Sequence, residues 1–428
     1  MHKTFVTILS FLSTVVVAHS QPGWRLLNSG ITAEIRDVAF ATTEIGCVIA
    51  TDNTVLQTMD GGASWKRIML PSSLDSTWRL SRIVFSDRNT AFITGGRFES
   101  NEPLLLRSID GGSHWSSVAF LADLDHYTFF SVSFPTPTTG YLTGSNHGGP
   151  NGTFSVVAKT TDGGVTWRAI DLPGLSGSFG VVDFRDNEHG MLITNHSPPS
   201  GSVIVATSDG GQSWRSAEPI EWLQRTDRNA ISHTPDGVWL ASSDWDIARS
   251  TDDGASWEII PFPSGDKPAV IRFAFASNTI GYAMSEPFTS HRIWKTVDGG
   301  RSWSADAYNV GEGYYNACSA PSESIAYVVG SNGMIIKTTT GGSSSVKEDV
   351  RSGTDGIRVV PQPVTTVATI EFPSLGREES LRIFNVRGEE IRRIEIPSGS
   401  SRATISDLQS GPYWCRFGNL SSRFFSIR

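Results

Sequence analysis

One eight-residue pattern recurs along the chain and constrains its fold more than any other feature. The pattern, Ser/Thr-x-Asp-x-Gly-x-Ser/Thr-Trp, begins at residues 58, 108, 160, 207, 250 and 296, with His114 in the second Ser/Thr position of the copy at 108. A seventh copy at 338 has Thr340 in place of Asp and Ser345 in place of Trp. Successive copies lie 42 to 52 residues apart. A period of this length with four short strands per unit is typical of propeller blades. We therefore predict an all-β fold, a seven-bladed β-propeller of four-stranded antiparallel blades.

The side chains that recur in this pattern are those that stabilise a tight turn. Asp and Ser or Thr can hydrogen-bond backbone groups two or three residues away, a Gly pair permits positive φ, and a Trp ring can pack between neighbouring sheets. Six aspartates spread around a ring cannot all serve one catalytic site. We interpret the motif as structural; its Asp and Trp residues are Asp60, Trp65, Asp110, Trp115, Asp162, Trp167, Asp209, Trp214, Asp252, Trp257, Asp298 and Trp303.

The seventh unit lacks a fourth strand of its own, and the N-terminal segment can supply it. The seventh motif leads into the polar run 343–345, which cannot form a buried strand. Residues 23–27 (GWRLL) resemble residues 64–68 (SWKRI), which open the fourth strand of the first unit. We predict that residues 24–28 form the outer strand of the seventh blade, because strands from both chain ends then remove an exposed sheet edge.

Loop lengths predict that the two faces of the propeller differ. The turns between the first and second and between the third and fourth strands are uniform, whereas the connections on the opposite face vary and are longest in blades two to four. Variable loops on a rigid scaffold are typical of binding surfaces, and aromatic residues and Arg are typical anchors. The binding candidates on this variable face are Trp78, Arg97, Asp125, Tyr127, His147, Trp222, Arg225, Trp245, Arg292 and Tyr314.

Charge and motifs argue against several classes of function. Residues 21–346 contain 22 Lys and Arg against 33 Asp and Glu, and this acidic balance disfavours a nucleic-acid partner. The chain has no Gly-x-Ser-x-Gly elbow, no His-Glu-x-x-His and no phosphate-binding loop, so we assign no catalytic residue, no metal and no cofactor. Cys47, Cys318 and Cys415 lack metal-ligand spacing. We interpret them as small buried residues, and the presence of a disulfide stays open.

The ends of the chain predict export. Residues 1–20 have the pattern of a signal peptide, with Lys3 before an apolar stretch of 14 residues that is too short to cross a membrane. The propeller then covers residues 21–342, and a Gly/Ser-rich linker covers residues 343–356. About seven short strands in residues 357–428 predict a small Ig-like β-sandwich. Because no other apolar run is long enough to span a membrane, we expect no transmembrane segment after signal cleavage.

The repeats resemble the Asp-box repeats of bacterial neuraminidases, which also occur in xyloglucanases, sortilin-type receptors and the photosystem II assembly and stability factor family. Seven units with Gly-Tyr strands and Asp-Gly-Gly-x-Ser/Thr-Trp turns are most similar to the last of these families. The resemblance covers about 320 residues and implies a fold, while function depends on the loops.

The C-terminal residues resemble the type A sorting domain of type IX secretion cargo. The resemblance rests on Pro361, Pro363, Gly388, Leu408, Gly411 and Tyr413 and on the basic end of the chain. It implies a Gram-negative bacterium and passage through the outer membrane, with the type IX machinery recognising residues 357–428. The mature protein is then either released or attached to the cell surface.

These predictions leave two functions open. The first is a non-enzymatic, surface or secreted propeller that binds a protein or glycan through its variable face. The alternative is a glycoside hydrolase of the sialidase type, which by that resemblance would need three arginines converging in the central depression beside a pair of carboxylates. The sequence favours binding, because the Phe/Tyr-Arg-Ile-Pro mark of sialidases is absent before the first repeat.

Overall fold

The structure is a computed structural model that describes residues 23–97, 99–120, 123–149, 152–172, 178–195, 202–217, 230–242, 246–261, 270–285, 292–306, 313–342, 358–360, 367–372, 379–385, 389–406, 411–417 and 420–426. The chain divides into two compact units, residues 1–345 and 346–428. The predicted signal peptide and linker lie outside the described residues.

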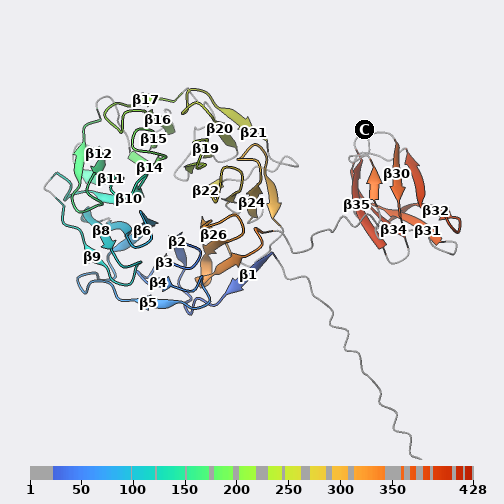
Figure 1. Ribbon diagram of the computed structural model, residues 1–428, viewed down its shortest axis with the longest axis horizontal. Helices are drawn as coiled ribbons and strands as arrows, with labels where there is room; N and C mark the ends of the chain where they lie inside the picture. The colour runs from blue at the N-terminus through green and yellow to red at the C-terminus, as the bar shows by residue number, and fades with distance from the viewer. Residues whose placement is uncertain are drawn as a thin grey trace, which may run out of the picture. The chain divides into compact units, whose positions relative to one another are not determined.

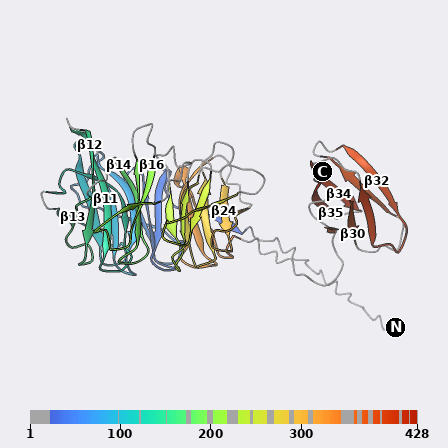
Figure 2. The same cartoon turned by 90° about the horizontal axis from the view of Figure 1, so that it is seen from above.

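Seven four-stranded antiparallel sheets make up the first unit and surround a central axis (Figure 1). In six of them four consecutive strands follow one another from the axis outward, and the strands run along the axis (Figure 2). The predicted seven-bladed propeller is therefore confirmed.

The strands are β2 (Ile35–Phe40), β3 (Gly46–Ala50), β4 (Val55–Thr58) and β5 (Lys66–Ile68) in blade one; β6 (Arg79–Phe85), β7 (Ala91–Arg97), β8 (Glu102–Ser108) and β9 (Ser116–Ser117) in blade two; β10 (Thr128–Ser133), β11 (Gly140–Gly149), β12 (Gly152–Thr160) and β13 (Arg168–Ile170) in blade three; β14 (Ser178–Phe184), β15 (Gly190–Asn195), β16 (Ser202–Thr207) and β17 (Arg215–Ser216) in blade four; β18 (Ile231–His233), β19 (Trp239–Ser242), β20 (Ile247–Ser250) and β21 (Glu258–Ile260) in blade five; β22 (Val270–Phe275), β23 (Gly281–Ser285), β24 (Arg292–Thr296) and β25 (Ser304–Asp306) in blade six; and β26 (Tyr315–Ser319), β27 (Ala326–Gly330), β28 (Ile335–Thr338) and β1 (Trp24–Leu27) in blade seven.

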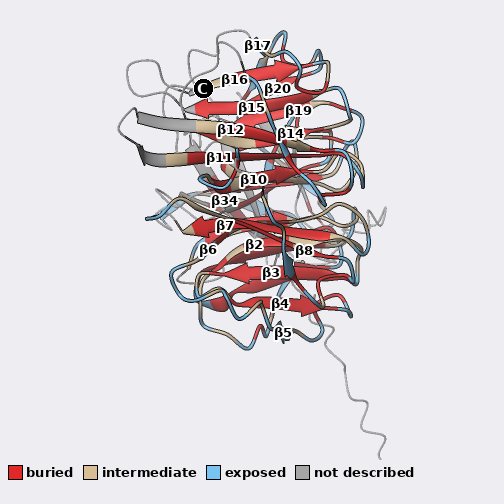
Figure 3. Cartoon of the chain, turned by 90° about the vertical axis from the view of Figure 1, so that its left-hand side faces the viewer, coloured by how far each residue is buried: buried red, intermediate tan, exposed pale blue. Residues whose placement is uncertain are grey.

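The core of the propeller lies between the blades. Middle strands such as β3, β19 and β27 are buried at every position, because each of their faces lies against a neighbouring blade. A strand buried on both faces has a continuous apolar sequence rather than an alternating one. Exposed residues gather in the turns at both ends of the strands (Figure 3).

Each Asp-box motif closes the turn between the third and fourth strands of its blade. In blade one the Thr58 hydroxyl accepts a hydrogen bond from the Gly62 amide (2.7 Å), and the Asp60 carboxylate accepts bonds from the Ser64 amide (2.9 Å) and hydroxyl (2.6 Å). Gly61 and Gly62 have φ angles of 66° and 81°, which Gly adopts without strain. Equivalent bonds recur in blades two to six.

A hydrogen bond from the preceding blade also reaches the first Gly of five motifs. The donor is the side chain just before the Ser or Thr of its own motif, and the acceptor is the Gly carbonyl of the next blade. The pairs, with distances of 2.6 to 3.1 Å, are Lys337 to Gly61, Gln57 to Gly111, Arg107 to Gly163, Lys159 to Gly210 and Arg249 to Gly299. Adjacent blades are thereby joined at the motif face.

The ring closes with the N-terminal strand, as the sequence predicts. β1 pairs antiparallel with β28 in a register that places Trp24 opposite Thr338 and Leu27 opposite Ile335. The Trp24 side chain is 1% exposed and contacts Tyr282 of blade six edge to face, with ring centroids 5.7 Å apart. The two ends of the propeller therefore meet in blade seven, where β1 pairs with β28 and supplies the fourth strand.

The extra residues of blades two to four lengthen hairpins. β11 and β12 in blade three have 10 and 9 residues, against 5 and 4 in β3 and β4 of blade one. The variable face is therefore raised over part of the ring, as β12 shows in Figure 2.

The second unit is a two-sheet β-sandwich. One sheet has the order β29-β30-β33 and the other β32-β31-β34-β35, and a core that includes Ile370, Phe372, Leu381, Ile383 and Phe417 is buried between them. The strands are β29 (Arg358–Val360), β30 (Val367–Glu371), β31 (Glu379–Phe384), β32 (Glu390–Ile396), β33 (Arg402–Ser406), β34 (Gly411–Phe417) and β35 (Leu420–Ser426). The seven predicted strands are all present.

Candidate functional site

A stacked pair on the variable face brings two predicted binding residues together. The Arg97 guanidinium at the end of β7 lies over the Trp78 ring, 4.6 Å from its centroid, within the range of a cation–π contact. Arg97 also bonds the carboxylates of Asp75 (2.9 Å) and Glu102 (3.1 Å). Asn53 donates to the Trp78 carbonyl (2.8 Å). These bonds fix a charged ridge at the border of blades one and two.

A groove of about 350 Å³ adjoins this ridge. We call it the rim groove. The connection between β3 and β4 forms one wall and the connection between β5 and β6 forms the other. Apolar side chains dominate the second wall: Met69, Leu70, Pro71 and Leu74. Met69 is 84% exposed, so its side chain is accessible at the groove.

Among the other predicted binding residues, Asp125, Tyr127 and Tyr314 do not line this groove. Asp125 is exposed and lies 3.0 Å from His126, whose ring is 4.5 Å from that of Tyr127. Burial raises the pKa of Tyr127, and Asp123 adds to the effect. Tyr314, before β26, is 40% exposed. The remaining candidates are either in strands whose side chains are not described (His147 in β11, Arg292 in β24) or outside the described residues (Trp222, Arg225, Trp245).

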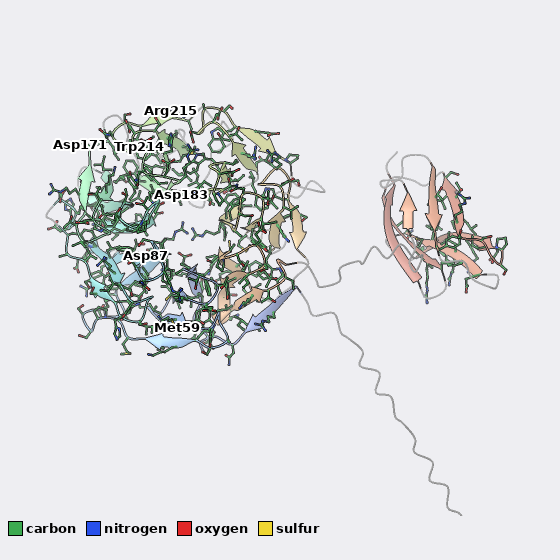
Figure 4. All side chains as sticks on the ribbon, in the orientation of Figure 1. Met59, Asp87, Asp171, Asp183, Trp214 and Arg215 are labelled. Atoms are coloured by element: carbon green, nitrogen blue, oxygen red, sulfur yellow. The ribbon has the colours of Figure 1, made fainter. Side chains whose placement is uncertain are left out.

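The first strands of the blades line a cavity of about 400 Å³ on the propeller axis. We call it the channel cavity. Its lining includes residues at the ends of these strands next to the motif face, such as Phe40, Phe85 and Pro135. The charged residues of its lining come from five blades: Asp37, Arg82, Asp183, Arg185, His233 and Arg272. Asp183 lies at the inner edge of the ring, whereas Trp214 and Arg215 lie toward its periphery (Figure 4).

Asp37 lies between two arginines of this cavity. Its carboxylate oxygens are 4.0 Å from Arg82 Nε and 3.9 Å from Arg272 Nη2, and one of them accepts a hydrogen bond from the Ile83 amide (3.0 Å). Burial raises the pKa of Asp37, and the Arg272 guanidinium and the Ile83 amide only partly oppose that effect. Burial likewise raises the pKa of the adjoining Cys318 thiol to about 12.

Asp183 has partners of its own. It accepts a hydrogen bond from the Ser133 hydroxyl (3.2 Å) and lies 2.9 Å from His233 Nδ1. Burial lowers the pKa of His233, but the Asp183 carboxylate outweighs burial, so the pKa is raised. Ser133 and His233 both contact the carboxylate rather than each other. This order differs from a nucleophilic triad, in which His stands between Ser and Asp.

Sequence reasoning missed the charged residues of the channel, although the sequence carries a signal for them. Asp37, Arg82 and Arg272 occupy one position, directly before the apolar triplet that ends the first strand of their blades. Other blades have an uncharged residue at this position, such as Ser131 in blade three and Val181 in blade four.

No candidate metal site and no disulfide occur among the described residues. Within those residues no group of His, Cys, Asp and Glu could hold a metal ion. Cys47, Cys318 and Cys415 are all buried, in agreement with their interpretation as small buried residues.

Seven blades with Asp-box turns, closed by an N-terminal strand, define the first unit as an Asp-box β-propeller. A family model described as "Photosynthesis system II assembly factor YCF48" matches residues 16–126 and 166–310, which is more than half of the chain. The chain belongs to this family. A second model, "Secretion system C-terminal sorting domain", matches residues 358–425.

Individual relatives agree with this assignment. The photosystem II assembly lipoprotein Ycf48 of Synechococcus sp. (strain CC9902) is 23% identical over 260 residues, which cover 59% of this chain and 71% of that protein. The solved structure of YCF48 bound to D1 peptide has a TM-score of 0.58 at 19% identity and covers 75% of this chain and 98% of its own. YCF48 from Cyanidioschyzon merolae has a TM-score of 0.55 at 18% identity, with 74% and 98% covered. At these identities the structures show the fold.

The sorting domain bears on where the protein works. It supports secretion or display at the cell surface, with the type IX machinery as a partner. Pro361, Pro363, Gly388 and Leu408 lie outside the described residues, Gly411 begins β34, and Tyr413 is buried within that strand. In the part of the chain that the structure describes, no helix has the length and apolar character that a membrane crossing requires.

Proposed function

We propose that the secreted propeller is a non-enzymatic binding protein that recognises a protein segment at the rim groove. The observation that carries the proposal is the combination of exposed Met69 and a charged ridge built on Trp78 and Arg97. An extended segment could place apolar side chains against Met69 and Leu74 while its polar groups meet Arg97 and Asp75. A few anchors of this kind supply most of the affinity in a protein interface.

The same geometry favours a protein segment over a glycan. Sugar rings stack on open aromatic faces, but the guanidinium of Arg97 lies over the Trp78 ring. The groove wall is aliphatic rather than aromatic. The relative whose structure is described as bound to a peptide, YCF48 with D1 peptide, shows that this fold can take such a ligand and supports the proposal by analogy.

The test compares binding by wild type and two variants. The mature propeller is probed against a peptide array and a glycan array, and hits are measured in solution. We expect peptide hits whose affinity falls at least tenfold in Trp78→Ala and in Arg97→Gln, because a buried-interface anchor contributes about 1.4 kcal/mol or more. Met59→Ala is the matched control, since Met59 is 55% exposed on the opposite, motif face. Hits on glycans alone, or equal losses in all three variants, would refute the proposal.

A glycoside hydrolase of the sialidase type is the second candidate, and the channel cavity is the observation in its favour. Arg82, Arg185 and Arg272 line it together with Asp37 and Asp183. The ion pairs do not converge, however: Arg82 and Arg272 meet at Asp37, while Arg185 bonds Asp186 and Asp253. Turnover of a fluorogenic sialoside that Asp37→Asn or Asp183→Asn abolishes would replace the binding proposal with this one.

A further inference from the structure

The channel cavity has an excess of positive charge in a chain whose propeller is acidic. Among its lining residues three arginines face two aspartates, and His233 forms a pair with Asp183. Asp183 is thus already balanced by a neighbour, and Arg185 by Asp186 and Asp253. The remaining group consists of Arg82, Arg272 and a single carboxylate, that of Asp37.

The two guanidiniums of this group have unused hydrogen-bonding capacity. Arg82 and Arg272 make no hydrogen bond to any residue that the structure describes, and their ion pairs with Asp37, at 4.0 and 3.9 Å, are longer than hydrogen bonds. Their side chains are only 17% and 22% exposed, and the Arg272 Nε is buried without a partner. A guanidinium carries five N–H donors, and a poorly solvated one gains from an anionic partner.

We propose that the channel cavity is a second binding site, which takes a ligand with a single carboxylate group between Arg82 and Arg272. Asp37 shows that carboxylate oxygens can approach both side chains to about 4 Å. A ligand carboxylate receives N–H donors from both guanidiniums on the side facing the cavity. The site is distinct from the rim groove, because the two linings share no residue.

Charge balance selects the class of ligand. Two guanidiniums and the Asp37 carboxylate leave one positive charge, which one carboxylate neutralises. A phosphate or sulfate dianion brings a second negative charge close to Asp37, where like charges repel strongly in a partly buried site. The ligand is therefore a monocarboxylate whose body fits about 400 Å³.

The experiment titrates the mature chain with gluconate and acetate, with phosphate and sulfate as comparison anions and glycerol as the neutral compound, by saturation-transfer NMR. We expect saturable binding of the monocarboxylates at least tenfold tighter than of the dianions. Arg82→Gln and Arg272→Gln each weaken it at least tenfold, because each removes a charge-assisted pair of bonds. Arg301→Gln is the control, because it removes one positive charge from an exposed residue of the motif face.

One variant is expected to bind the ligand more tightly than wild type, so misfolding, which would weaken binding, cannot produce the expected result. Asp37→Asn retains an oxygen acceptor for the Ile83 amide and removes the competing charge, so monocarboxylate binding becomes several-fold tighter. Trp78→Ala leaves it unchanged, which separates this site from the rim groove. The proposal is overturned if no monocarboxylate saturates the protein, if phosphate binds as well as gluconate, if Arg82→Gln binds like wild type, or if Asp37→Asn weakens binding.

Discussion

Substituting Trp24 tests the closure of the ring. Its indole is buried at 1% exposure between blades six and seven, in a cluster with Tyr282, Met284, Ile293 and Ile336. Trp24→Ala removes these contacts and leaves a cavity, which costs about 3–5 kcal/mol for a buried aromatic residue. β1 contributes only four residues to blade seven, so the loss also weakens the one strand that links the two ends of the propeller.

The matched control lies two residues further along the same strand. Leu26 is 64% exposed, so Leu26→Ala should change the free energy of unfolding by less than about 0.5 kcal/mol. Urea unfolding followed by tryptophan fluorescence measures both variants. Twelve of the 13 tryptophans precede residue 343, and the signal therefore reports almost entirely on the propeller.

The expected result is a large shift of the unfolding midpoint for Trp24→Ala and almost none for Leu26→Ala. Equal and small shifts would refute the reasoning, because they would mean that the N-terminal strand is not needed to hold blades six and seven together. Removing residues 21–28 provides a second measurement, and it should destabilise the propeller at least as much as Trp24→Ala.

Two further predictions concern the Asp-box turns. Hydrogen bonds from the Ser64 hydroxyl and amide lower the pKa of Asp60 to about 2, below the unfolded value of about 4. The stability that the ionised Asp60 contributes is therefore complete above pH 4 and is lost as the pH falls through 2. In Asp60→Asn the free energy of unfolding should fall less steeply with decreasing pH over this range. Gly112→Ala should destabilise the propeller by clearly more than Gly30→Ala in the same urea assay, because both have positive φ but only the Cβ at 112 would lie 2.4 Å from Cys47 Sγ. Equal losses for the two Gly variants, or an unchanged acid slope, would contradict these interpretations.

Much of the fold could be predicted because it repeats. Each motif specifies one turn by local hydrogen bonds, and each blade contains one motif. Seven copies at a regular spacing are therefore enough to infer seven sheets. The closure by Trp24 followed from a missing strand at one end and a surplus strand at the other. What could not be predicted was the set of bonds between blades, such as Lys337 to Gly61, because the partners are far apart in sequence and their local context differs.

The sequence predicted which types of residue on the variable face bind a ligand, but not which of these residues contact one another. The sequence placed Trp78 and Arg97 on the variable face, but not the contact between them, since loop conformation determines which side chains meet. Nor did it indicate Met69, whose exposure depends on the path of the connection between β5 and β6. Composition predicts that such loops bind something, and only geometry distinguishes an aliphatic groove from an aromatic platform.

The channel shows why the sequence signal of a propeller site is weak. Its lining takes one or two residues from each first strand, so neighbouring side chains such as Asp37, Arg82 and Arg272 are 45 residues or more apart in the chain. No local motif can form under this constraint. On the motif face, in contrast, the Ser, Thr and Asp side chains of the motifs hold turns and the side chains just before them join blades, which leaves little freedom for variation at those positions. Charged residues on the inner strands can change without breaking those bonds, and it follows that selectivity in this fold can evolve along the axis as well as on the variable rim.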